Sequence, residues 1–172
     1  MVTAAASSAT THGAAWAAAA QTPDPELPML TLADLGILRD VQELEDRVVA
    51  TITPTYSGCP AMREIGLDVR RRLEAAGYEN VQVATQLAPA WTSDWITEEG
   101  RGKLRAAGIA PPGAAWTGTG PVPVTLGLPT SAPCPHCGSA STSHTAAFGA
   151  TACRSLHRCH TCGEPFEAVK AI

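Results

Sequence analysis

Two pairs of cysteines near the end of the chain have the spacing of metal ligands. They occur in the segments Cys134-Pro-His-Cys137-Gly and Cys159-His-Thr-Cys162-Gly, with 21 residues between the pairs. Two cysteines separated by two residues on a tight turn can direct both sulfur atoms at one ion, and a following glycine can take a positive φ angle that brings backbone N–H groups to the thiolates. Two such units complete a tetrahedron with no open position. The pattern therefore predicts a closed, structural metal site with Cys134, Cys137, Cys159 and Cys162 as its ligands.

Zinc is the metal that this pattern favours. Iron is the less favoured alternative, because paired units of this kind also hold a single iron in rubredoxin-like sites. Without a metal, the same cysteines would be four unrelated buried thiols or two disulfides. Four histidines nearby could replace a ligand, but beside four well-spaced cysteines we expect them to be bystanders; they are His136, His144, His157 and His160. Because the segment has few apolar residues, we expect it to fold only with its metal.

A fifth cysteine, Cys59, is a candidate for thiol chemistry. It lies in Thr53-Pro-Thr55-Tyr-Ser57-Gly-Cys59-Pro, between a predicted strand and a predicted long helix. The positive end of a helix dipole favours a thiolate, and Thr55 and Ser57 add hydroxyl groups. The position suits a nucleophile or a soft-metal ligand, and equally a small buried residue at a strand–helix corner. No histidine base lies beside it in sequence, which argues against a hydrolase.

The sixth cysteine and an acidic tripeptide carry weaker signals. Cys153, between the two metal knuckles, could be a spare thiol, a transient cluster ligand paired with Cys59, or part of a small core, which is the commonest role. The segment from Asp24 to Glu26 has the composition of a turn with two charges.

The elements that would position these residues follow from hydrophobic periodicity. Strands are predicted at 37–41, 48–53 and 81–87, with 42–47 as a hairpin turn. A helix is predicted over residues 60–76, because apolar residues recur there at three- and four-residue spacing. Pro60 suits its first turn and Gly77 its end.

A second helix is predicted from about Thr97 to Ala107, with Ser93 and Asp94 as candidate caps. Trp91 and Trp95, just before it, fit either a core anchor or a partner-docking patch, and we favour the core. The order ββαβα predicts a small α+β sandwich, followed by the C-terminal four-cysteine zinc ribbon.

Composition excludes several classes of function. The chain has 172 residues and a formal net charge of −4, so it lacks the basic surface of a nucleic-acid-binding protein. The alanine-rich N-terminus lacks the basic region of a signal peptide, and no run of eighteen apolar residues predicts a membrane span. We therefore expect a cytoplasmic protein, in which cysteines serve as metal ligands or reactive thiols more often than as disulfides.

Shifts in composition divide the chain into four predicted segments. Residues 1–21 are of low complexity and fit a poorly ordered tail or a loose helix equally well, and residues 22–110 form the α+β domain. Residues 111–133, rich in Pro, Gly, Ser and Thr, are typical of a linker, and residues 134–172 form the ribbon.

Several segments together resemble the phenylacetyl-CoA epoxygenase D subunits (PaaD, also called PaaJ). The segments that carry the resemblance are Asp24-Pro-Glu26, Leu32–Arg39, Thr51–Met62, Pro89–Trp95, Gly108–Pro112, both cysteine knuckles, Thr151–Cys153 and Glu164–Phe166. The resemblance covers about residues 22 to 170. Its N-terminal part is also similar to the small iron–sulfur assembly-associated domain of SufT-like and cytosolic iron–sulfur targeting factors.

The resemblance implies a role in the epoxidation of phenylacetyl-CoA during aerobic phenylacetate catabolism. In that system the oxygenase chemistry belongs to a di-iron subunit and a flavin/iron–sulfur reductase. The chain agrees, since it contains neither a Glu-x-x-His pair nor a Gly-x-Gly-x-x-Gly loop. It would be a non-catalytic accessory component with the oxygenase and reductase subunits as partners.

Two roles fit such a component. One is the maturation of an iron–sulfur or other metal centre, with Cys59 as the functional thiol, Asp24 and Glu26 on the same surface, and an iron–sulfur cluster bound transiently. The alternative is a structural or regulatory docking subunit without thiol chemistry.

Overall fold

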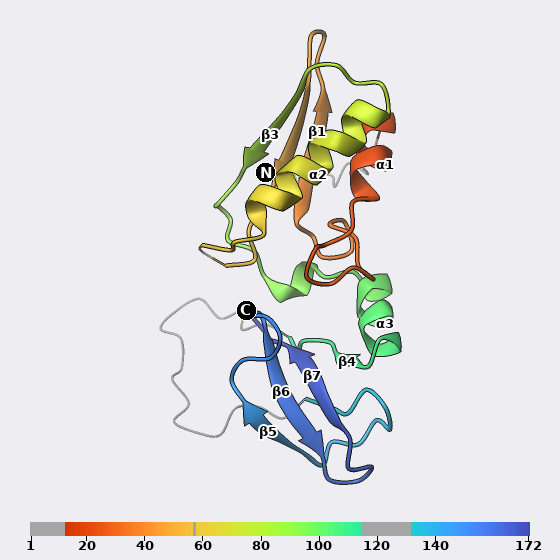
Figure 1. The fold of residues 1–172 in the computed structure, drawn as a ribbon, viewed down its shortest axis with the longest axis vertical. Helices are drawn as coiled ribbons and strands as arrows, with labels where there is room; N and C mark the ends of the chain where they lie inside the picture. Colours follow the sequence, from red (N-terminus) through yellow and green to blue (C-terminus); the bar gives the residue numbers. More distant parts are fainter. Residues whose placement is uncertain (1–12, 57, 115–131) are drawn as a thin grey trace, which may run out of the picture.

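Two small β-sheets, one above the other in Figure 1, form the framework of the protein. The computed structural model describes residues 13–56, 58–114 and 132–172. The first sheet pairs β1 with β2 in antiparallel and β2 with β3 in parallel. Its strands are β1 (Leu38–Glu43), β2 (Val48–Ile52) and β3 (Val81–Thr85). The predicted α+β architecture followed by a ribbon is confirmed, and each predicted strand and helix agrees with the structure to within two residues at either end.

Helix α2 (Met62–Ala75) makes the crossover between the parallel strands β2 and β3. It buries Ile65, Val69 and Leu73, the centre of the apolar stripe that predicted it. Gly77 ends the helix with φ +97°, as expected of a C′ glycine. Pro60 lies before the first turn rather than in it, because the N-cap is Ala61.

Helix α1 (Ala14–Ala20) lies within the stretch whose sequence fits a tail or a loose helix equally well. Ala15 and Ala19 are completely buried in the main core, and the backbone N–H of Ala15 donates to the Glu43 carboxylate at 3.0 Å. Alanine has the highest helix propensity and allows close approach of the backbone. Residues 14–20 therefore pack with the α+β part, while residues 1–12 lie outside the described residues.

The segment before helix α3 (Glu98–Ala106) corrects one prediction. Thr97 caps this helix, since its hydroxyl accepts a backbone N–H of the first turn at 3.0 Å. The predicted caps are wrong, because Ser93 and Asp94 lie instead in the short 3₁₀ turn η1 (Ser93–Trp95).

The two tryptophans of this segment have different environments. Trp91 is buried in the core and donates its indole N–H to the Leu35 carbonyl at 2.8 Å. Trp95 is half-buried, and the Arg39 guanidinium lies 3.7 Å from its ring centroid. The core interpretation is therefore correct for Trp91.

The second sheet has the order β4-β7-β6-β5. Its strands are β4 (Ile109–Ala110), β5 (Thr142–Ala146), β6 (Arg154–Cys159) and β7 (Pro165–Val169). Strand β4 directly follows α3 and pairs in parallel with β7, so the end of the α+β segment adds an edge strand to the ribbon.

The C-terminus joins the ribbon to the α+β part a second time. The Ile172 carbonyl accepts hydrogen bonds from the Ser93 backbone N–H at 3.0 Å and the Thr92 hydroxyl at 2.8 Å. Val169 of β7 is buried in the main core. Of the predicted linker, residues 115–131 lie outside the described residues, and the division of the chain into four segments stays a prediction.

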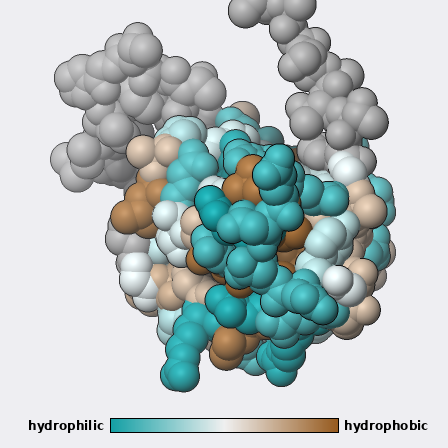
Figure 2. Space-filling model, turned by 90° about the horizontal axis from the view of Figure 1, so that it is seen from above, coloured by the Kyte–Doolittle hydropathy of each residue, from teal (hydrophilic) through white to brown (hydrophobic). Residues whose placement is uncertain are grey.

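The hairpin end of the α+β part is mostly polar. Figure 2, which views the molecule from the β1–β2 hairpin end, shows mainly hydrophilic residues, with hydrophobic ones in separate spots. Within the described residues, no helix has the length and apolarity that a membrane span requires.

Candidate functional site

The four cysteines of the knuckles come together in the ribbon. Their sulfur atoms all lie within 4.8 Å of one another, with Cys134 and Cys159 buried and Cys137 and Cys162 exposed. Gly138 and Gly163 follow the knuckles with φ +74° and +81°, as predicted. Among the described residues no other group of metal-ligating side chains is gathered so closely, and no histidine joins this one.

The geometry of these sulfurs fits a tetrahedral metal ion. Cys134 Sγ lies 3.7 Å from Cys162 Sγ, and Cys137 Sγ lies 3.6 Å from Cys159 Sγ. A tetrahedron with metal–sulfur bonds of about 2.3 Å separates its sulfurs by about 3.8 Å. The ribbon therefore contains a four-cysteine metal site with a closed coordination shell.

Backbone N–H groups, burial and the neighbouring sulfurs shift the pKa values of these thiols in opposite directions. Backbone N–H groups, first that of Cys162, lower the pKa of Cys159 to about 6. The Glu164 N–H also lowers the pKa of Cys162, but desolvation and the neighbouring sulfurs together raise it to about 12. Four thiolates in such close contact need a cation to offset their repulsion.

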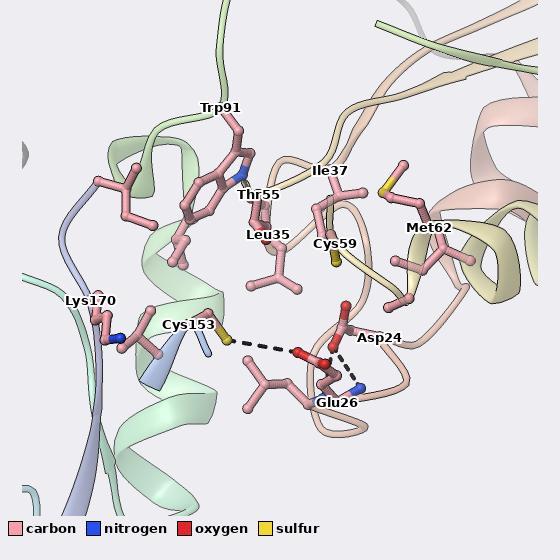
Figure 3. Close-up of a pocket in the computed structure, with 16 residues that line it drawn as sticks. Asp24, Glu26, Leu35, Ile37, Thr55, Cys59, Met62, Trp91, Cys153 and Lys170 are labelled. Carbon is pink, nitrogen blue, oxygen red and sulfur yellow. Dashed lines mark hydrogen bonds between the residues drawn. The ribbon is translucent and has the colours of Figure 1, made fainter. Parts of the chain in front are cut away.

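A second group of side chains, made up of thiols and carboxylates, lines a small cavity of about 30 Å³ between the α+β part and the ribbon. Figure 3 shows Cys59 from the β2–α2 loop, Asp24 and Glu26 from the loop before β1, and Cys153 from the β5–β6 loop around it. Lys170 also lines the cavity, and most of the rest of the wall is apolar, with Leu35, Ile37, Met62, Ile65 and Trp91 among its residues. Thr55 also lines the cavity, whereas Ser57 lies outside the described residues.

The environment of Cys59 differs from the expected thiolate-stabilising one. Because α2 begins only at Met62, Cys59 lies outside its first turn. Burial raises the pKa of the Cys59 thiol, and Glu26 and Asp24 raise it further. The Ala61 N–H and the Thr55 side chain oppose this shift without cancelling it. The prediction of a stabilised thiolate is therefore wrong for the protein without a bound cation.

The two acidic residues have different local roles. Asp24 is 7% exposed, and one of its carboxylate oxygens accepts the backbone N–H groups of Glu26 at 2.9 Å and Leu27 at 2.8 Å. It therefore stabilises a turn, while burial raises its pKa. Glu26 points instead across the cavity, where the Cys153 thiol donates to its Oε2 at 3.8 Å.

The tertiary structure brings Cys153 to this group, and a cluster ligand paired with Cys59 was one of the three roles that its sequence left open. It lies 127 positions after Glu26 in sequence, and burial followed by the Glu26 charge raises the pKa of its thiol. Burial raises the pKa of the Tyr56 hydroxyl, and Cys59, Glu26 and Cys153 raise it further. The sequence offered only a weak signal for either residue: Tyr56 precedes Cys59 by three positions, and Cys153 is left over after the metal knuckles.

The loop that carries Cys153 is braced by its own strands. Arg154 Nη1 pairs with Glu167 Oε2 at 2.6 Å, and Glu167 Oε1 accepts the backbone N–H of Ala150 at 2.7 Å. Lys170 donates its backbone N–H to the Cys153 carbonyl at 3.0 Å and its ammonium to the Ala152 carbonyl at 2.7 Å. These bonds hold the Cys153 backbone against β7.

Known proteins resemble both parts of the chain. The family described as iron-sulfur cluster assembly protein matches residues 14–85, and the PaaD zinc beta ribbon domain matches residues 118–170. The Escherichia coli (strain K12) protein named as the D subunit of 1,2-phenylacetyl-CoA epoxidase is 43% identical over 157 residues, which is 91% of each chain. An Fe-S protein maturation auxiliary factor from Porphyromonas gingivalis (strain ATCC BAA-308 / W83) is 36% identical over 78 residues, or 44% of this chain and 73% of that protein.

Among solved structures, a domain of unknown function, DUF59, from Bacillus anthracis is 27% identical. The match covers 52% of this chain and 87% of that chain, with a TM-score of 0.48.

Proposed function

This chain belongs to the family of 1,2-phenylacetyl-CoA epoxidase D subunits, and from that membership we propose that it is a non-catalytic accessory subunit that assists the maturation of an iron–sulfur or other metal centre of that enzyme system. The observation that carries the proposal is the cavity lined by the Cys59 thiol, the Glu26 carboxylate and a second thiol. A volume of about 30 Å³ suits a metal ion with its ligands better than an organic substrate. Thiols and carboxylates are donors for iron.

Cys59 is the functional thiol in this proposal. Its raised pKa keeps it protonated in the absence of cargo, and a bound cation reverses the effect because it favours the thiolate. Thr55 supports the thiolate by a hydrogen bond, and Asp24 holds the turn that presents Glu26. Iron, alone or as a transient iron–sulfur cluster, is cargo here rather than a resident cofactor.

Zinc in the ribbon has a structural role in this proposal. The closed set of Cys134, Cys137, Cys159 and Cys162 leaves no position for a substrate, and the adjoining sheet has a core of few residues. Zinc supplies the folding energy that this core lacks.

The partners that we propose are the oxygenase and reductase subunits of the epoxidase, because the E. coli relative is named as a subunit of this enzyme. A metal centre in either subunit would receive the cargo.

One observation favours the alternative of a docking subunit without thiol chemistry. Burial and nearby carboxylates raise the pKa of both Cys59 and Cys153, which makes each a poorer nucleophile at neutral pH. In this alternative the two thiols only fill the joint between the α+β part and the ribbon.

Replacing Cys59 separates the two functions. Cells that carry Cys59→Ala are assayed for epoxidase activity and for the iron–sulfur content of the purified reductase, with the exposed substitution Gln82→Ala on β3 as a control. Maturation predicts that Cys59→Ala lowers both quantities and that the control lowers neither. Lost activity with unchanged cluster content would favour the docking subunit, and unchanged activity and cluster content would remove Cys59 as a functional site.

A further inference from the structure

We propose that the cargo site is built from both parts of the chain, with Cys153 of the ribbon as a second thiolate ligand for iron opposite Cys59. This proposal rests on the proposed function and adds a ligand to it. Two thiols on opposite walls of one cavity, with a carboxylate beside one of them, form a donor set that suits ferrous iron or a small iron–sulfur unit.

The position of Cys153 is the first argument. Its thiol does not join the four cysteines that form the ribbon's metal site, although it lies in the same small sheet. It points instead into the cavity, at the Glu26 carboxylate. A cysteine needed only for packing within the ribbon would not have to reach a charged group of the other part of the chain.

The bracing of the β5–β6 loop is the second argument. The Cys153 carbonyl accepts the backbone N–H of Lys170, and the ammonium of Lys170 holds the preceding residue. Glu167 holds Ala150 and, through Arg154, the Thr151 hydroxyl, which lies 3.0 Å from the Cys153 sulfur. Ligands for a metal are effective when such contacts orient them in advance.

The joint between the two parts is the third argument. The pairing of β4 with β7 and the hydrogen bonds from Ser93 and Thr92 to Ile172 fix the ribbon against the α+β part at two places. One of these contacts is made by strand β7 and the other by Ile172, which follows it. Lys170, whose backbone N–H holds the Cys153 carbonyl, lies between them. The ribbon thus sets the distance across the cavity between Cys153 and Cys59.

Binding releases protons and changes no oxidation state. Each thiol gives up its proton as its sulfur forms a bond to iron, and both protons are released to water. The Cys153 proton leaves through the Glu26 carboxylate, which already accepts the Cys153 S–H, and the Cys59 proton passes to water directly. The charge of the cation also offsets the repulsion between two thiolates and the Glu26 and Asp24 carboxylates.

The test compares three full-length variants, each loaded with zinc: Cys153→Ser, Cys59→Ser and the loop control Ala147→Ser, an exposed position where the change adds a hydroxyl and removes no ligand. Each receives ferrous iron alone or ferrous iron with sulfide under anaerobic conditions. Bound iron, retained zinc and the thiolate-to-iron charge-transfer absorption are measured. The two arms distinguish an iron ion from an iron–sulfur unit as cargo.

We expect the native chain and Ala147→Ser to bind iron with zinc retained, and each cysteine variant to lose at least about tenfold in iron affinity. Binding by Cys153→Ser at the native affinity would overturn the shared site, as would iron that enters only by displacing zinc. If Cys153→Ser or Cys59→Ser loses zinc or structure, the alanine variant at the same position replaces it under the same criteria.

The maturation assay in cells separates this proposal from the one on which it rests. Normal reductase cluster content with Cys153→Ser and low content with Cys59→Ala would reject Cys153 as a ligand and leave the proposed function in place. Normal content with Cys59→Ala would reject the proposed function itself.

Discussion

The ion pair between Arg154 and Glu167 should stabilise the loop of Cys153 far more than an ordinary surface ion pair would. The side chains of Arg154 and Glu167 are only 10% and 22% exposed, and their charged atoms lie 2.6 Å apart. Glu167→Gln keeps the size of the side chain and removes the charge. The Arg154 guanidinium is then left in a largely buried place without its carboxylate.

The expected cost follows from this burial. A hydrogen bond to a charged group contributes about 1.5–3 kcal/mol, and leaving one charge of a fully buried pair unpaired costs about 3–5 kcal/mol. Because Glu167 is partly exposed, we expect Glu167→Gln to lower the free energy of unfolding by about 2–3 kcal/mol. The matched control is Glu98→Gln, which breaks a pair with Arg105 whose side chains are 80% and 50% exposed. This control should cost less than about 1 kcal/mol.

Urea unfolding of the zinc-loaded protein measures the free energy, and hydrogen exchange in β6 and β7 locates the change. The rate at which Cys153 reacts with an alkylating reagent reports on the loop itself, and this rate should rise in Glu167→Gln but not in Glu98→Gln. Equal losses of stability in the two variants, or an unchanged rate at Cys153, would refute the bracing role of Glu167.

Three further outcomes are expected. Chelation of the ribbon metal should make the second sheet sensitive to proteolysis, while most of the helical circular dichroism of α1 to α3 remains. A metal-free ribbon that stayed resistant to proteolysis would contradict the structural role of the site. In thermal unfolding, Gly36→Ala should lower the free energy of unfolding by about 1–3 kcal/mol more than Gly77→Ala does. Both glycines have a positive φ, but only at Gly36 would the new Cβ lie 2.7 Å from Trp95 Cβ. Equal losses of stability in the two variants would contradict this steric account. Burial raises the pKa of Asp34, but the Lys103 ammonium and Thr31 outweigh it and hold this pKa below its usual value. The stability that the ion pair with Lys103 provides is therefore present above about pH 4, and it is lost as the pH falls through the lowered pKa. Lys103→Met should therefore be less stable than the native protein at pH 7, with a difference that shrinks at low pH in urea titrations, and a difference independent of pH would argue against the ion pair.

The helices, the strands and the metal ribbon could be predicted from the sequence alone, because all of them depend on local spacing. The repeat that places Ile65, Val69 and Leu73 on one face predicted α2, and the two C-x-x-C-G units predicted four clustered sulfurs. The caps of α3 were harder to predict, since Ser93, Asp94 and Thr97 all have suitable side chains and only the backbone path decides which one precedes the helix.

The surroundings of Cys59, by contrast, depend on tertiary packing. Local reasoning places a helix dipole beside this thiol, but its protonation depends on burial and on two carboxylates more than thirty positions earlier in the sequence, so the direction of the shift was reversed. Cys153 is the clearest case: its spacing to any other cysteine carries no signal, and it meets Glu26 because β4 joins the ribbon sheet and the C-terminus binds η1. Contacts between distant segments are set by how sheets pack, and side chains that meet in this way leave no periodic pattern in the sequence.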